Sequence, residues 1–274
     1  MSKGIYIVTG ATGGIGKAIV SDLCVRDEVK SVILACRNVG KAQQFVSFLA
    51  TVYPHKELIV LPLDLESFAS VRAFGEEVVN RGYKIKALIH NAGTMPGEVR
   101  VTGDGYESAT QTNFLSPMLL TELLVDNLLP DANVVFTTSM TRRIARFIPD
   151  WADKAISCHD RFVTYGRSKK MLTAYALMLA KRLKDRGICV NCSDPWIVDT
   201  GIITMGHKII DRLSNMLFRP LIYTPEQGAA SAISALDSSL SGYIFTRKRH
   251  THIPPSYGSE PVRNIITKAY SDIE

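Results

Sequence analysis

The segment YGRSK at 165–169 places a phenol four residues before an amine. Residues at i and i+4 share one face of a helix, so Tyr165 and Lys169 are expected to be neighbours. An ammonium group beside a phenol favours the phenolate, which predicts a Tyr165 pKa below its ordinary value of about 10. Such a tyrosine could give a proton to a reacting oxygen or take one from it. The same spacing also occurs by chance on exposed helices, so the pair alone does not establish chemistry.

A glycine-rich turn offers a second chemical function near the start of the chain. TGATGGIG at 9–16 follows an apolar run and precedes a helical pattern. Glycines there let the backbone approach a pyrophosphate, and the helix N-terminus supplies N–H groups and partial positive charge. The spacing is G-x3-G-x-G rather than the usual GxGxxG. The expected phosphate-binding residues are Gly10, Thr12, Gly13, Gly14, Ile15 and Gly16.

An arginine ends the second apolar run, in LACRN at 34–38. NAD sites usually have a carboxylate at this distance from the glycine turn. The guanidinium of Arg37 would instead pair with the 2′-phosphate of NADP, and Lys41 lies one helical turn later. The sequence therefore favours NADP(H) over NAD(H). The alternative is an arginine that is simply solvated at a strand end.

Short apolar runs alternate with longer amphipathic segments along the chain. Continuous apolar strands joined by helices indicate a parallel sheet that is covered on both faces. We therefore predict an α/β, single-domain, doubly wound Rossmann fold with a seven-stranded parallel sheet. The expected strands are at 5–9, 31–36, 57–63, 86–90, 133–138, 188–193 and 242–245.

The regions near the C-terminus carry clear local signals. TPEQG at 224–228 predicts a helix start with Thr224 as N-cap and proline at the first helical position. The main domain is expected to span 1–246. The tail at 247–274 begins with mixed charge, proline and glycine, and is expected to be partly loop.

The amino-acid composition limits which ligands the protein can bind and in which cellular compartment it is expected. A net charge of +6 and a pI near 9.0 favour anionic ligands, without choosing among a nucleotide, a nucleic acid and an acidic membrane. Five scattered cysteines are typical of reduced thiols in a cytoplasmic protein without a metal site. No apolar run is long enough for a membrane span, so a soluble protein is expected. The basic clusters at 141–146 and 247–250 lack interleaved aromatics, which favours solvated loops over nucleic-acid or membrane binding.

Taken together, these motifs resemble the short-chain dehydrogenase/reductase family. Besides the glycine turn and YGRSK, the matching motifs are LDLES at 63–67, HNAG at 90–93, TNFLSPMLLTELL at 112–124, FTTSM at 136–140 and DPWIVDT at 194–200. The long gap between Ser139 and Tyr165, with ACRN and TPEQGA, looks most like the retinol dehydrogenase and protochlorophyllide reductase branch. The resemblance implies a Rossmann fold, an NADP(H) cofactor and hydride transfer on hydrophobic ketones, aldehydes or alcohols.

The resemblance also implies roles for particular residues. Tyr165 is the general acid and base, and Lys169 lowers its pKa and holds the nicotinamide ribose. Ser139 donates a hydrogen bond to the developing oxyanion, and Asn113 positions a relay water. Taken singly, Ser139 could merely finish a strand and Asn113 could merely shape a helix. The further cofactor contacts implied are Arg37, Asn38, Lys41, Asp64, Leu65, Asn91, Ala92, Gly93, Pro195, Trp196, Val198 and Thr200, together with Tyr165 and Lys169.

Three features depart from that pattern or leave it open. Trp196 stands where the family has glycine, and an indole is not expected to follow a glycine backbone at positive φ. Either the loop runs differently or Trp196 narrows the site. His90 replaces an asparagine and is expected to keep a structural hydrogen bond. The segment 201–223 matches the position of a substrate lid, although its apolar stripe could equally pack on the core or on a membrane surface.

The leading interpretation is an NADP(H)-dependent oxidoreductase for a small to mid-sized apolar substrate that is retinoid-, steroid- or aldehyde-like. The alternative is a non-catalytic NADP-binding protein that senses redox state, whose mark would be a broken Tyr/Lys pair. The expected partner is a small-molecule substrate, not nucleic acid. The apolar segment 171–180 fits either a homodimer contact or a buried core helix.

Overall fold

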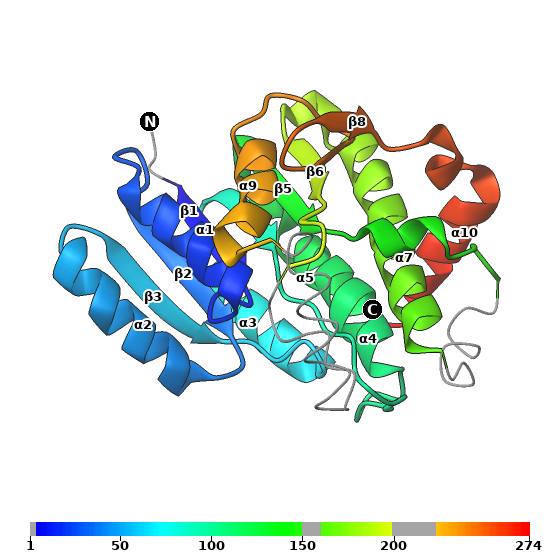
Figure 1. The fold of residues 1–274 in the computed structure, drawn as a ribbon, viewed down its shortest axis with the longest axis horizontal. Helices are drawn as coiled ribbons and strands as arrows, with labels where there is room; N and C mark the ends of the chain where they lie inside the picture. Colours follow the sequence, from blue (N-terminus) through cyan, green and yellow to red (C-terminus); the bar gives the residue numbers. More distant parts are fainter. Residues whose placement is uncertain (1–3, 150–159, 199–222) are drawn as a thin grey trace.

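Seven parallel strands and one antiparallel edge strand form a single sheet in the computed structural model, which describes residues 4–149, 160–198 and 223–274 (Figure 1). The strand order is β3-β2-β1-β4-β5-β6-β7-β8, and only the β7–β8 pair is antiparallel. The strands are β1 (Ile5–Thr9), β2 (Ser31–Cys36), β3 (Glu57–Pro62), β4 (Ile85–His90), β5 (Leu128–Thr137), β6 (Cys189–Ser193), β7 (Tyr243–Phe245) and β8 (His250–His252).

The predicted seven-stranded parallel sheet is confirmed, but the described sheet has eight strands rather than seven. The extra strand β8 has the sequence HTH and is exposed along its whole length. A short polar edge strand lacks the alternation of apolar and polar residues from which a strand is predicted. It belongs to the tail beyond residue 246, which is therefore more regular than a loop.

The strand order reverses direction beside β1. The chain runs outward from β1 through β2 to β3 and then crosses back to β4, which pairs with the other side of β1. In open parallel sheets the crevice at the carboxyl ends of such neighbouring strands is where ligands bind. The ends of β1 and β4 are the glycine turn and the HNAG segment, so the topology brings these two motifs together.

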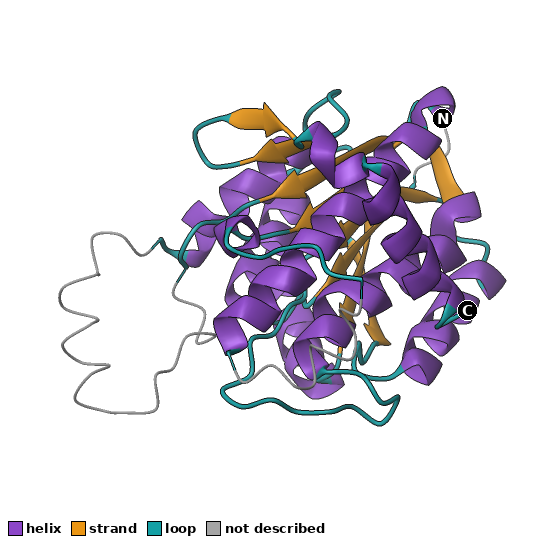
Figure 2. Cartoon of the chain, turned by 90° about the vertical axis from the view of Figure 1, so that its right-hand side faces the viewer, coloured by secondary structure: helices purple, strands orange, loops and turns teal. Residues whose placement is uncertain are grey.

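Helices cover both faces of the sheet (Figures 1 and 2). The longer ones are α1 (Gly14–Val25), α2 (Val39–Val52), α3 (Phe68–Asn80), α5 (Ser116–Leu124), α7 (Arg161–Arg182), α9 (Pro225–Leu236) and α10 (Glu260–Ser271). The shorter turns are α4 (Ser108–Thr110), η1 (Gln111–Leu115), η2 (Val125–Asn127), η3 (Met140–Arg143), η4 (Lys184–Arg186) and η6 (Pro255–Gly258).

Alternation along the strands divides the core into two layers. In β1, Ile7 packs in the layer of α3, α5 and α7, whereas Val8 packs in the layer of α1, α2 and α9. Ile33 and Leu34 of β2 divide in the same way. This follows from strand geometry, because successive side chains point to opposite faces of a sheet.

Helix α10 folds the C-terminus back onto the domain. Val262, Ile266, Ala269 and Ile273 are buried in the layer that contains α7. Their spacing of three or four residues is a helical signal that the proline-rich stretch before it obscured. Arg72 donates hydrogen bonds to the carbonyl groups of Ile273 and Glu274 at 2.6 and 2.7 Å, which fastens the end of the chain.

Two local predictions near the C-terminus have definite outcomes. The helix start at Thr224 is confirmed, since its side chain and that of Gln227 form a reciprocal capping box at the start of α9. The segment 171–180 is mostly buried within its own chain, as expected for a core helix. A homodimer contact there stays a prediction. Across the described ranges, no helix is both long and apolar enough to cross a membrane.

Candidate active site

Tyr165 and Lys169 lie on α7 and face a cavity at the carboxyl ends of the central strands. The cavity has a volume of about 410 Å³ and is lined by the glycine turn, Asn91–Gly93, Thr137–Thr141, Tyr165, Lys169 and Pro195–Val198. A second cavity of about 440 Å³ lies toward β2 and β3. The two share Gly10, Ala92 and Gly93, so together they form one continuous groove across the sheet edge.

A glycine on α7 brings this helix close to η3, the turn that Ser139 caps. A Cβ on Gly166 would lie 2.7 Å from the carbonyl oxygen of Thr141, which is closer than two such atoms can approach. Only glycine allows this packing of α7 against η3. The helix start is fixed by Asp160, whose side chain accepts hydrogen bonds from the N–H groups of Phe162 and Val163 at 2.9 and 3.2 Å.

The Tyr165 side chain is half-buried beside Ser139 and lines the cavity with it. Desolvation raises the pKa of Tyr165 to about 12, even though the neighbouring Ser139 hydroxyl lowers it. The predicted lowering of this pKa by Lys169 is therefore wrong for the site as it stands. The ammonium group of Lys169 lies 5.8 Å from the Tyr165 ring centre and donates a hydrogen bond to the carbonyl of Thr137 at 2.8 Å. Desolvation outweighs any effect it has on the phenol.

Lys169 itself has an altered affinity for its proton. The side chain is buried, and this burial lowers its pKa to about 8. At neutral pH the amine is thus still mostly protonated, while Tyr165 is almost entirely in its phenol form. Both protonated groups line the same cavity.

Ser139 keeps its own proton available for donation. Its hydroxyl oxygen accepts hydrogen bonds from the backbone N–H and the hydroxyl group of Thr141 at 3.3 and 3.0 Å, so it serves as the N-cap of η3. A hydroxyl that accepts in this way still has one O–H to give. Tyr165 or a substrate oxygen in the cavity can receive it.

Asn113 is fully buried in the π-helical turn η1, behind the cavity wall. Its side-chain oxygen accepts from the N–H of Thr94 at 2.8 Å, and its amide group donates to the Thr94 carbonyl at 2.8 Å and to Ser168 at 3.1 Å. A Cβ on Gly93 would lie 3.2 Å from both this oxygen and the Lys169 nitrogen. The amide therefore braces the wall beside Lys169. One lone pair is left on its oxygen for the predicted relay water.

The glycine turn has the geometry of an anion cradle. Helix α1 begins at Gly14, and Gly13 at its N-cap makes no side-chain capping bond. A Cβ on Gly16 would lie 2.2 Å from the Gly10 carbonyl oxygen, so this position admits only glycine. Asn91 donates to the carbonyls of Thr9 and Gly10 at 3.1 and 3.3 Å and holds the turn in place. The N–H groups of the first helical turn remain for a negatively charged group.

The second cavity gathers the predicted adenosine-side residues. Its lining includes Thr12, Arg37, Asn38, Lys41, Asp64 and Leu65. The Arg37 side chain is 70% exposed and forms a long ion pair of 3.8 Å with Glu66. Asn38 accepts from the Lys41 N–H at 2.8 Å and caps α2. Arg37, directly after β2, and Lys41, in the first turn of α2, therefore line the same cavity.

Glu66 and Arg100 also line this cavity and were missed by reasoning from sequence. Glu66 pairs with Arg100 and accepts from the hydroxyl of Ser108 at 2.5 Å. A carboxylate directly after the LDL motif was the available signal. Arg37, Lys41 and Arg100 outnumber Glu66 and Asp64, so the lining has a net positive charge.

A buried ion pair next to Ser139 is the second feature missed. Arg142 and Asp194 are 4% and 5% exposed, and their charged atoms lie 2.5 Å apart. The same nitrogen of Arg142 donates to the Ser139 carbonyl at 2.6 Å, while Asp194 accepts from the Trp196 N–H at 3.3 Å. The expectation that 141–146 is a solvated basic loop is wrong at Arg142, because a carboxylate 52 positions away neutralises it.

Trp196 adopts the backbone conformation of the glycine that it replaces. Its φ is 66°, so the expectation that an indole cannot follow this path is wrong. A left-handed conformation costs a residue with a Cβ roughly 1–2 kcal/mol. The indole is 46% exposed and lines the cavity together with Phe162 and Ile197. Thr200 and the proposed lid at 201–223 lie outside the described residues, apart from Tyr223.

His90 makes the structural hydrogen bond that was expected. Its Nε2 lies 2.8 Å from the Thr121 hydroxyl, and its ring stacks on Phe136 at 4.7 Å. Complete burial lowers the pKa of His90 to about 3, so the ring is neutral at physiological pH. It braces the sheet between β4 and α5.

The sequence and fold are similar to those of known oxidoreductases. A sequence model of the family described as short chain dehydrogenase matches residues 4–208. Human retinol dehydrogenase 12 is 30% identical over 257 residues, which cover 92% of this chain and 80% of that protein. Human polyprenol dehydrogenase is 29% identical over 282 residues, with coverage of 97% and 83%.

Solved structures agree with this fold. An NADPH-bound carbonyl reductase from chicken fatty liver superposes with a TM-score of 0.65 at 22% identity, covering 91% of this chain and 94% of that chain. A short chain dehydrogenase from Burkholderia cenocepacia J2315 in complex with NADP gives a TM-score of 0.69 at 20% identity, with coverage of 89% and 96%.

Proposed function

The chain belongs to the short-chain dehydrogenase family, and from this premise we propose that it is an NADP(H)-dependent oxidoreductase that interconverts a carbonyl group and an alcohol. The substrate is small to mid-sized and apolar. One observation carries the proposal. The hydroxyl groups of Ser139 and Tyr165 line the same cavity as the glycine turn, so a proton donor lies in the groove proposed for the dinucleotide.

Residues along both parts of the groove support NADP(H) as the cofactor. The uncapped N-terminus of α1 and the glycine cradle suit the pyrophosphate. Arg37 and Lys41 would hold the 2′-phosphate, and Lys169 the nicotinamide ribose. The bound NADP and NADPH of the two structural neighbours support this choice of cofactor.

The protein's own groups would complete the reduction. NADPH supplies the hydride to the carbonyl carbon when it is bound. Ser139 donates a hydrogen bond to the carbonyl oxygen and steadies the negative charge that develops there. Tyr165 then gives its proton to that oxygen, for which the phenol form favoured by burial is the required state. Lys169 remains mostly charged at neutral pH and favours the phenolate that results.

An apolar substrate is supported by the walls of the cavity and by the relatives. Met95, Met140, Phe162 and Trp196 line the cavity beside the two hydroxyl groups. Such walls exclude water and bind hydrocarbon surface. The relatives retinol dehydrogenase 12 and polyprenol dehydrogenase are named after long apolar alcohols.

Turnover tests the proposal. Purified protein with NADPH should reduce all-trans-retinal or a medium-chain aldehyde, and Tyr165→Phe should lower kcat by about 10²–10⁴-fold. Tyr53→Phe is the matched control, because Tyr53 ends α2, away from the groove. Full activity in Tyr165→Phe would contradict the role of the phenol. Tight NADPH binding without turnover of any carbonyl would favour the redox-sensing alternative instead.

A further inference from the structure

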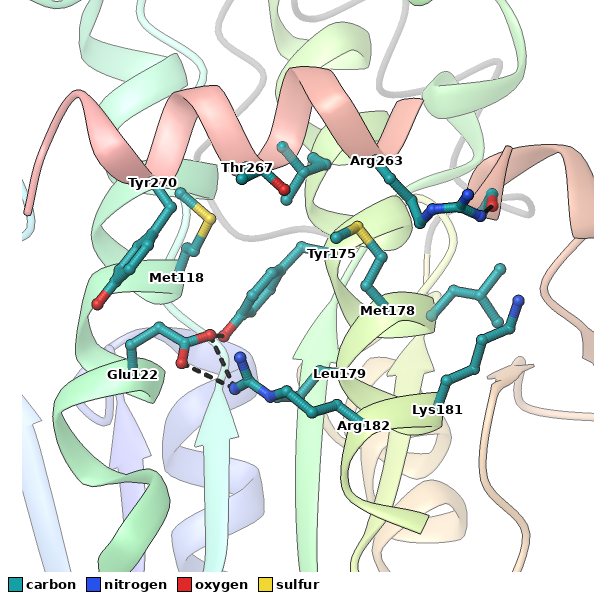
Figure 3. Close-up of a pocket in the computed structure, with 13 residues that line it drawn as sticks. Met118, Glu122, Tyr175, Met178, Leu179, Lys181, Arg182, Arg263, Thr267 and Tyr270 are labelled. Carbon is teal, nitrogen blue, oxygen red and sulfur yellow. Dashed lines mark hydrogen bonds and ion pairs between the residues drawn. The ribbon is translucent and has the colours of Figure 1, made fainter. Parts of the chain in front are cut away.

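A separate cavity of about 400 Å³ opens between α5, α7 and α10 (Figure 3). None of the residues that line it also lines either part of the groove described above. Its size falls within the range of pockets that bind small molecules. Part of its wall is the C-terminal helix α10, which makes an open cleft of the outer face of α7.

Apolar side chains form most of its surface. Met118 comes from α5, Leu177 and Met178 from α7, and Ile266 from α10. Methionine is flexible and polarisable, so a wall that contains two methionines adapts to a hydrocarbon chain. Figure 3 shows Met178 between the ends of the cavity, with Lys181 and Arg263 at one end and Glu122 and Tyr270 at the other.

The polar groups at the Glu122 end satisfy one another. The Glu122 carboxylate accepts from the Tyr175 hydroxyl at 2.7 Å and pairs with Arg182 at 2.8 Å. Its negative charge is therefore balanced within the protein. This end of the cavity presents no free charge to a ligand.

The opposite end concentrates positive charge. Arg263 donates to the Gly258 carbonyl at 2.7 Å, and a Cβ on Gly258 would lie 3.3 Å from the Lys181 ammonium nitrogen. The two cations thus converge on one glycine, and the structure records no carboxylate partner for either within its described ranges. Like charges that converge in this way are stabilised by an anion.

We propose that this cavity binds a long-chain carboxylate, with its carboxylate at Lys181 and Arg263 and its aliphatic chain along Met178 and Met118. Charge complementarity selects the headgroup, since the one acidic residue of the lining is already paired. The apolar middle selects an unbranched hydrocarbon chain over a compact polar anion. The site is independent of the proposed hydride transfer.

Calorimetric titration of the full-length protein with dodecanoate, below its micelle-forming concentration and with NADPH saturating, tests this directly. One dodecanoate should bind per chain, and methyl dodecanoate should bind more weakly. Lys181→Met/Arg263→Met should weaken dodecanoate binding about fivefold or more and remove the preference for the acid. Thr267→Trp, which fills the cavity from α10, should weaken both ligands about tenfold or more.

The matched control is Lys184→Met/Lys248→Met, which removes the same charge from exposed positions outside the cavity and should bind as the wild type does. Equal affinity in the wild type and in both cavity variants would overturn the proposal, because the ligand would then lie elsewhere. So would equal binding of acid and ester. Absence of saturable binding, together with a self-association by sedimentation that Thr267→Trp abolishes, would assign this face to a second copy of the chain and likewise overturn it.

Discussion

Removing one half of the buried Arg142–Asp194 pair should destabilise the protein far more than removing both halves. Arg142→Met leaves the Asp194 carboxylate 5% exposed and without its counter-charge. Breaking a buried pair in this way costs about 3–5 kcal/mol, whereas replacing both charges by apolar groups is often neutral. Each kcal/mol shifts Tm by roughly 2–4 °C in a protein of this size class, so Tm of the single variant should fall by about 6–20 °C.

Urea unfolding of Arg142→Met, Asp194→Leu and the double variant measures this coupling. The double variant should recover most of the lost free energy of unfolding. It should not recover activity, because the Ser139 carbonyl loses the Arg142 donor at 2.6 Å and the Trp196 N–H loses its acceptor. Strictly additive single effects would refute the buried-pair reasoning. Full activity in the double variant would refute the positioning role.

Three further results are expected. Trp196→Gly removes the strain of a left-handed backbone conformation, so the free energy of unfolding should stay unchanged or rise by about 1 kcal/mol. Loss of the indole should raise KM for an apolar aldehyde in steady-state assays. A clear loss of stability would contradict the strain at Trp196. Because the pKa of Lys169 is lowered, the unfolded chain binds more protons than the folded chain between pH 8 and 10. The destabilising contribution of Lys169 should therefore shrink as pH rises through that window, and the unfolding free energy of wild type relative to Lys169→Met should increase by about 1.4 kcal/mol per pH unit. A difference that does not change with pH would contradict the burial of the charge. Arg37→Ala should weaken NADPH binding about tenfold and leave NADH binding unchanged, as measured by nicotinamide fluorescence. Arg81→Ala, at an exposed arginine, is the control. An equal loss of affinity for both cofactors would contradict the role of Arg37 in binding the 2′-phosphate.

Local signals made most of the fold predictable. The apolar runs of β1, β2 and β4 coincide with strands of the sheet, and the residues TPEQ at 224–227 indicated the α9 cap. Helix α10 and strand β8 were harder, because one follows a proline-rich stretch and the other is polar on both faces. Elements at a sheet edge or outside the main layers carry weaker patterns than elements in the core.

The candidate site was predictable in its residues but not in its electrostatics. Tyr165, Lys169 and Ser139 meet in one cavity, as the helical spacing and the strand ends indicated. The pKa of Tyr165 moves the opposite way from the prediction, because burial depends on the whole fold and a sequence motif does not show it. The Arg142–Asp194 pair joins residues 52 apart, a distance at which no local pattern operates.

Transfer of deuterium tests the central claim most directly. Protein incubated with NADPH deuterated at nicotinamide C4, in separate samples for each face, and with an apolar aldehyde should yield alcohol that carries deuterium on its carbinol carbon. One face should transfer and the other should not. Tyr165→Phe should form almost none of this product. Alcohol without deuterium from either cofactor, or no alcohol at all across retinoid, steroid and aliphatic carbonyls, would contradict hydride transfer by this site.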